Sequence, residues 1–303
     1  MKRAIAFWAF IIIVLPGSAP AGEGCPPRGY TRGQLLDLKQ AGFDIGKDAA
    51  RNTLALGLAA CLSDPDPDIR DGVAFEALAH WMRKGQLTER TRLGLYHDLL
   101  GQLRSDGDAN GFQRPFAALV LAEVARTDRI RAWFTRAMRT RLVDAAARYL
   151  AGVRDYRGFS DSEGWRHGVA HGSDLVLQLV LNPKVNAAQV RQLMAAVASQ
   201  VAPRGPVFYV FGEPERLARA AYYAYRRGVL DDAAWAAWFD SATNPSPLPD
   251  WRAAYASRAG LARRHNTLAF LRALYLDANG DTDNQTPALA DMVRHAIGRV
   301  SGG

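Results

Sequence analysis

Apolar residues recur at intervals of three and four over most of the chain, the spacing that one buried face of an α-helix produces. Short segments rich in Asp, Pro and Gly separate these stretches, as helix ends and connections require. The one β-like run, at 206–211, is too short and solitary to build a sheet. The pattern therefore predicts an all-α protein, with helices over residues 68–85, 91–103, 112–125, 129–153, 186–201, 213–228, 231–242, 251–276 and 287–300.

The connections between these helices are short, which favours antiparallel neighbours. The stretch "DPDPDIRDGVAFEAL" at 64–78 looks like the start of a HEAT-type repeat, with capping aspartates and proline followed by an arginine just inside the helix. A helix pair cannot bury its apolar face alone, so pairs are expected to stack. We predict a HEAT-like α/α superhelix that forms a single domain over residues 22–303.

The first residues have a different character, because a basic "MKR" precedes the apolar run "AIAFWAFIIIVLPG". Ala19 and Ala21 then provide the small residues that signal peptidase reads. This predicts a signal peptide over residues 1–21 and an exported protein, periplasmic or secreted. The run is too short for a retained anchor, so no stable membrane span is expected after cleavage. Glu23 argues against a lipid on Cys25.

The chain has two cysteines, Cys25 and Cys61. An exported protein permits a disulfide between them, but a free buried thiol at Cys61 fits its apolar surroundings equally well. The net charge is +8, and the basic residues are scattered. Their densest cluster, at 129–141, wraps around a predicted helix and forms no stripe, so we expect no nucleic-acid partner.

The stretch "GWRHGVAHGSDL" carries the most suggestive chemistry. Ser160 and Glu163 form the S-x-x-E pattern of a capping box, which predicts a helix from residue 161. At 100° per residue, His171 and Asp174 lie within about 40° of His167 on that helix, and Glu163 lies one turn earlier on the same face. These four polar side chains would therefore share one stripe.

Two imidazoles and a carboxylate on one face suit Zn²⁺ or another divalent metal, with Glu163 as a fourth ligand or as general base. Without a metal, a His–Asp pair could work as a general acid and base. The same stripe also fits a hydrogen-bonded seam between packed helices, or a ligand-binding groove without catalysis. Three glycines beside it, at 164, 168 and 172, indicate that another element approaches this backbone closely.

Several segments resemble the bacterial domain of unknown function 2785 family. They are "DPDIRDGVAFEALAHWMRKGQL", "FQRPFAAL", "DYRGFSDSEGWRHGVAHGSDL" and "FGEPERLARA". The third is the most specific, with the family's pattern matched at Asp155, Arg157, Gly158, Gly164, Trp165, His167, His171 and Asp174. Arg114 is also matched, although its neighbours Gln113 and Pro115 depart from the serines of the family pattern.

The resemblance implies a helical, HEAT-like fold and no particular activity. It makes Asp155, Arg157, Trp165 and Arg114 candidate binding residues. Asp155 and Arg157 would hold the turn before the central helix, whereas Trp165, off the polar stripe, also fits a core position.

Other motifs are weaker. The loop "DANGDTDN" has the alternating oxygen ligands of a calcium loop, but Thr282 and Ala288 stand where glycine and glutamate belong, which favours a polar loop. Glu213 and Arg216 are spaced for an ion pair and helix cap. With no complete catalytic motif, we predict a module that binds or scaffolds an unknown protein or small ligand. The alternative is a metal-dependent, hydrolase-like enzyme that uses the His167/His171/Asp174 face.

Overall fold

The structure, a computed structural model, describes residues 24–108, 110–280 and 286–302. The predicted signal peptide lies outside these residues, and so does the centre of the polar loop at 281–285. Within the described ranges, none of the helices combines the length and the hydropathy needed to cross a membrane.

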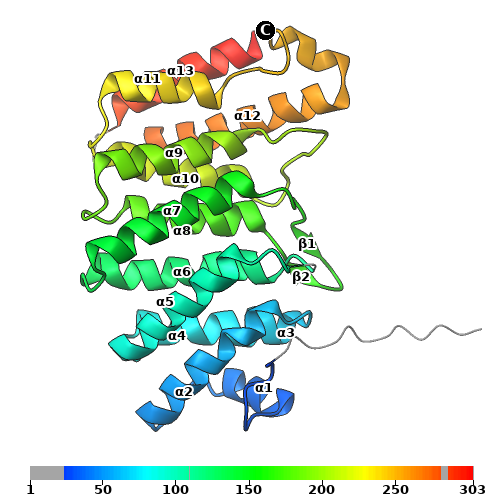
Figure 1. Ribbon diagram of the computed structural model, residues 1–303. Helices are drawn as coiled ribbons and strands as arrows, with labels where there is room; N and C mark the ends of the chain where they lie inside the picture. The colour runs from blue at the N-terminus through cyan, green and yellow to red at the C-terminus, as the bar shows by residue number, and fades with distance from the viewer. Residues whose placement is uncertain (1–23, 109, 281–285, 303) are drawn as a thin grey trace, which may run out of the picture.

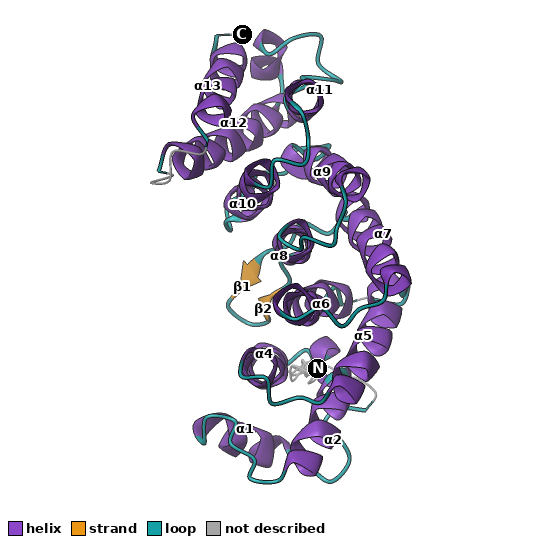
Figure 2. Cartoon of the chain, turned by 90° about the vertical axis from the view of Figure 1, so that its left-hand side faces the viewer, coloured by secondary structure: helices purple, strands orange, loops and turns teal. Residues whose placement is uncertain are grey.

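The helices form two stacked rows that curve together along the molecule (Figures 1 and 2). The inner, concave row contains α1 (Arg32–Gln40), α4 (Glu76–Arg83), α6 (Gln113–Ile130), α8 (Gly168–Val180), α10 (Glu213–Arg226) and α12 (Arg258–Asn279). The outer row contains α2 (Asp48–Leu58), α5 (Glu89–Arg104), α7 (Arg136–Gly152), α9 (Ala187–Val201) and α11 (Asp232–Ala242). The short α3 (Pro67–Ile69) precedes α4, and α13 (Pro287–Ser301) packs on α12 at the far end.

Neighbours within a row pack on one another, as α6 does on both α4 and α8. The outer helices also contact inner ones, as α5 contacts α6 and α7 contacts α8, and Trp238 of α11 meets Phe270 of α12. The buried hydrophobic side chains form one cluster from Cys25 to Val300. The mostly helical class predicted from the apolar spacing is confirmed. The assignment to HEAT-type repeats stays a prediction.

Three predicted helices are interrupted. The helix expected over 251–276 breaks at Ser257, which is extended between the 3-10 turn η3 (Arg252–Ala256) and α12 and caps α12 by accepting the N–H of Gly260. The helix expected over 129–153 breaks between α6 and α7, because the Asp128 carboxylate accepts the N–H groups of Trp133 and Phe134 and holds the chain in a turn. Thr135 then caps α7 through the N–H of Met138. The helix expected over 68–85 contains a π-helical stretch, η2 (Arg70–Phe75), between α3 and α4.

The helix predicted from residue 161 was wrong. Residues Phe159–Ser160 (β1) and Gly164–Trp165 (β2) pair as a small antiparallel hairpin instead, and the Ser160 hydroxyl accepts the N–H of Glu163 inside its turn. Helix α8 begins only at Gly168, after His167 adopts the left-handed conformation with φ of 56°. The hairpin projects on the concave side of the molecule (Figure 2).

Cys25 and Cys61 are joined in a disulfide, so the alternative of a free thiol at Cys61 is excluded. The bond ties the segment before α1 to the short 3-10 turn η1 (Ala60–Ser63). With its sulfur in this bond, Cys25 has no thiol left to carry a lipid.

Candidate functional site

A pocket of about 680 Å³ opens on the concave row, among α4, α6, α8, α10 and the hairpin. The sequence-predicted residues Trp165, His167, His171 and Asp174 all line it. The remaining lining residues are Asp71, Phe75, Glu76, Arg83, Phe116, Leu119, Ala122, Glu123, Gln178, Phe211 and Arg216. The polar stripe therefore borders an open pocket, although the helix that carries it is shorter than predicted.

Aromatic rings form one wall of this pocket. Trp165 is 36% exposed, so it is not the core residue that its position off the stripe had suggested. Its ring stacks on that of His167, with centroids 4.6 Å apart and planes 21° from parallel. Phe211, equally exposed, meets Trp165 edge to face. Such a partly exposed aromatic platform is suited to hold a flat apolar group.

The two histidines are buried and each has a ring nitrogen without a hydrogen-bond partner, Nε2 in His167 and Nδ1 in His171. Burial lowers the pKa of His167 to about 4, and the Arg216 guanidinium adds to this shift. The pKa of His171 lies well below its usual range, chiefly from burial and then from the charge of His167. Both imidazoles are therefore neutral at pH 7, and each has one buried ring nitrogen whose hydrogen-bonding capacity is unused.

This burial makes the protein less stable in weak acid. In the unfolded chain His167 takes up a proton near pH 6.5, whereas the folded protein resists it down to about pH 4. Lowering the pH from 7 to 5 therefore favours unfolding, and we expect His167 alone to lower the free energy of unfolding by about 2 kcal/mol. Denaturant unfolding followed by circular dichroism at the two pH values measures this loss.

The variant His167→Asn removes the titrating group and keeps a residue that accepts the left-handed backbone. Its stability should fall less than that of the wild type over the same pH interval. His295→Asn, at an exposed position on α13, is the matched control and should retain the full loss. Equal losses in the wild type and His167→Asn would contradict the prediction.

Asp174, the third predicted ligand, is bound to an arginine. Its Oδ2 accepts a hydrogen bond of 2.5 Å from Nη1 of Arg216 on α10. Burial raises the pKa of Asp174 and the Arg216 charge opposes that shift. The expected pair of Arg216 with Glu213 does not form; Glu213 instead accepts the N–H of Phe211. Among the described residues, no three His, Cys, Asp or Glu side chains gather in an arrangement that could hold a metal ion.

Glu163, the candidate general base, lies in the hairpin turn and does not line the pocket. Its carboxylate receives two hydrogen bonds, of 2.9 and 3.0 Å, from the buried guanidinium of Arg166. That guanidinium in turn lies over the Phe112 ring, 4.2 Å from its centroid. Glu163 therefore stiffens the segment that carries Trp165.

The other family-matched residues lie elsewhere. Arg114 and Asp155 line a separate pocket of about 310 Å³ with Tyr149. Asp155 accepts hydrogen bonds from the backbone and side chain of Arg157, as expected for a turn before the central helix. The structure thus places Arg114 and Asp155 in a different pocket from the histidines, whereas Arg157 and Glu163 line neither of the two.

The glycines of α8 admit a close neighbour. A Cβ on Gly172 would lie 3.0 Å from Cε1 of Tyr149 on α7, and one on Gly168 would lie 3.3 Å from the Tyr149 hydroxyl. The predicted close approach therefore occurs at these two positions, and also at Gly164 in the hairpin, where a Cβ would lie 2.8 Å from Cβ of Pro67. At Gly168 and Gly172 the neighbour is α7. This contact presses α8 onto α7 and leaves the opposite face, with the histidines, toward the pocket.

Sequence reasoning missed the residues that reach this pocket from other elements. Asp71 and Phe75 come from the π-helical stretch, Glu123 from α6 and Phe211 from the loop before α10. Asp71 and Phe75 stand in the HEAT-like stretch at 64–78, and Phe211 begins the segment "FGEPERLARA", but neither pattern indicated that these residues line a pocket. Glu123 stands in no motif.

The chain belongs to the DUF2785 family, a family of proteins of unknown function, whose model matches residues 99–276. No curated protein and no solved structure matches the chain.

Proposed function

We propose that this member of the DUF2785 family is an exported binding module, whose concave pocket holds a neutral ligand with a flat apolar face. The proposal rests on which side chains of the pocket already have hydrogen-bond or ion-pair partners. The aromatic wall of the pocket is exposed and two of its imidazole nitrogens have no partner, whereas its charged groups are already engaged.

The acidic residues of the pocket each have a basic partner. Glu123 pairs with Arg83 and Asp174 with Arg216. Asp71 and Glu76 pair with Arg70 and Lys39 in the same way. A charged ligand would have to break one of these ion pairs, so a neutral one is favoured.

The ligand would stack on Trp165 and Phe211. It would form hydrogen bonds with His167 and His171 once their free ring nitrogens, which are buried in the unliganded protein, turn toward it. A cyclic small molecule, or a planar side chain of a partner protein, has this chemistry. A scaffolding role would use the same contacts, because stacked helical arrays present extended concave surfaces to their partners.

Export is supported by the N-terminal sequence pattern and by the Cys25–Cys61 disulfide, since disulfides persist in oxidising compartments. Cell fractionation tests export: the compartment that contains the protein is determined, and its N-terminal residue is identified. A start near residue 22 is expected, and an uncleaved cytoplasmic chain would exclude export.

We expect Trp165→Ala to abolish binding in the pocket. The measurement is saturation-transfer NMR with a library of neutral aromatic and cyclic polar fragments, applied to the wild type and the variant. Fragments that bind the wild type should bind the variant at least tenfold more weakly, because both the stacked ring and its buried area are lost.

Tyr255→Ala is the matched control, since Tyr255 is an aromatic residue that is 60% exposed and lies outside this pocket. It should leave the same fragments bound. A library that yields no binders, or binders lost equally from both variants, would sink the proposal.

A further inference from the structure

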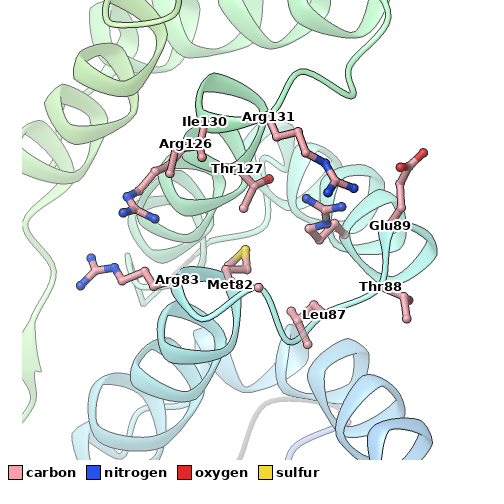
Figure 3. A pocket seen from close by; sticks show the side chains of 11 residues that line it. Met82, Arg83, Leu87, Thr88, Glu89, Arg126, Thr127, Ile130 and Arg131 are labelled. Atoms are coloured by element: carbon pink, nitrogen blue, oxygen red, sulfur yellow. The ribbon is translucent and has the colours of Figure 1, made fainter.

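A third hollow, of about 390 Å³, lies where the C-terminal ends of α4 and α6 meet the start of α5 (Figure 3). Its wall is unusually rich in arginine. The lining residues are Met82, Arg83, Gly85, Leu87, Thr88, Glu89, Arg92, Arg126, Thr127, Ile130 and Arg131. Of these, Glu89 alone carries a negative charge.

Three of the four arginines have no acidic partner. Arg83 is paired with Glu123, but Arg92, Arg126 and Arg131 form no ion pair within the described part of the chain. Figure 3 shows Arg131 reaching from the end of α6 toward the side where Glu89 lies, with Arg126 on the opposite side. The hollow therefore keeps an excess of positive charge.

Arg92 is held in place without being neutralised. Its guanidinium lies over the ring of Trp133, 4.9 Å from the centroid, and its Nε is buried without a hydrogen-bond partner. Burial lowers the pKa of Arg92, the nearby Glu89 carboxylate opposes this shift, and the charge of Arg131 adds to it. Glu89 is the one carboxylate that faces Arg92 and Arg131 in the lining of the hollow, so one negative charge stands against two guanidinium groups, and the Nε donor of Arg92 is left without an acceptor.

We propose that this hollow, between Arg92 and Arg131, binds a phosphate group. Guanidinium groups match phosphate in geometry and donate paired hydrogen bonds to its oxygens. Two of them balance the charge of nearly −2 that a phosphate monoester carries at pH 7. The apolar Met82, Leu87 and Ile130 border the site, so an organic substituent on the phosphate has a surface to contact.

The first test is titration calorimetry with inorganic phosphate at constant ionic strength. Saturable binding is expected for the wild type. Arg131→Gln should weaken it by about tenfold, because a charge-assisted hydrogen bond is lost. Arg92→Lys keeps the positive charge but removes the planar guanidinium and its paired N–H donors, and it should also weaken phosphate binding. This variant separates the effect of hydrogen-bond geometry from that of charge alone.

Arg148→Gln is the matched control, because Arg148 is exposed on α7, away from the hollow. It should change the phosphate affinity by less than twofold. The proposal is overturned if phosphate does not bind the wild type, or if the Arg131 and Arg148 variants lose the same affinity.

A second arm identifies the source of the phosphate group, with vesicles of phosphatidylglycerol and phosphatidylcholine in a sedimentation assay. Sedimentation that depends on Arg131 and is reversed by inorganic phosphate identifies a lipid headgroup. Phosphate binding without sedimentation identifies a soluble phosphate compound. Sedimentation of a protein that binds no inorganic phosphate would reject the site.

Discussion

Replacing Arg70 by methionine should lower the free energy of unfolding by about 3–5 kcal/mol, the cost of removing one partner from a buried charged network. Arg70 is fully buried. It donates hydrogen bonds to the carbonyl oxygens of Asp64, Pro65 and Glu163, at 2.9, 3.2 and 2.6 Å. Its Nε also lies 2.7 Å from Oδ1 of Asp71, an ion pair without hydrogen-bond geometry. Methionine fills much of the space but leaves these acceptors unpaired.

Replacing Arg70 should also affect the pocket that Trp165 lines. The bond to Glu163 joins the hairpin turn to the π-helical stretch η2, so the segment bearing Trp165 would lose an anchor. Arg32→Met is a close control, because Arg32 pairs with Asp66 and Asp68 nearby but is half exposed. It should cost less than about 1 kcal/mol. Denaturant unfolding of the two variants would refute the prediction if their losses were similar.

Asp128→Ala should be comparably destabilising, by about 3–5 kcal/mol. Asp128 is 1% exposed. Its carboxylate accepts the N–H groups of Trp133 and Phe134, two hydrogen bonds of 3.0 Å from Arg139 and one of 2.7 Å from Asn182. Removing it leaves the buried Arg139 unpaired, opens the turn between α6 and α7, and detaches the turn that follows α8.

Acid should have a related effect. Despite its burial, these hydrogen bonds hold the pKa of Asp128 below its usual 3.8. The stability that depends on its charge is therefore present above about pH 4 and is lost as the pH falls below that value.

Thermal unfolding at pH 7 tests the effect of the substitution, by comparing Asp128→Ala with Asp98→Ala, at an exposed position on α5. The prediction fails if the Asp98 variant melts as low as the Asp128 variant.

The apolar spacing predicted most helices because each buries one face against its neighbours in the stack, so that fold and local pattern agree. The prediction from apolar spacing and local motifs failed where a residue far away in the sequence determines the local structure. The pattern of Ser160 and Glu163 fits a helix start as well as a hairpin turn, and the turn is held by Arg70, 93 positions away in the sequence. Such a contact leaves no trace in a local window.

The candidate site shows the same contrast between residues that local spacing predicted and residues that distant elements contribute. His167, His171 and Asp174 were grouped by spacing, and the structure places all three on one pocket wall. Their partners were not predictable, because Arg216 comes from α10 and Phe211 from the preceding loop. The exposure of Trp165 also depends on the hairpin, which the local pattern did not indicate.

The Cys25–Cys61 bond makes the two ends of the stack unequal. It closes a covalent ring that contains all of α1 and α2, so these terminal helices cannot peel away from the array one after the other. At the other end, α13 packs mainly on α12 and has no such closure (Figure 1). Arrays of this kind lose order from their ends, where a helix has fewest neighbours. Fraying therefore starts at the C-terminal end and stops short of the ring.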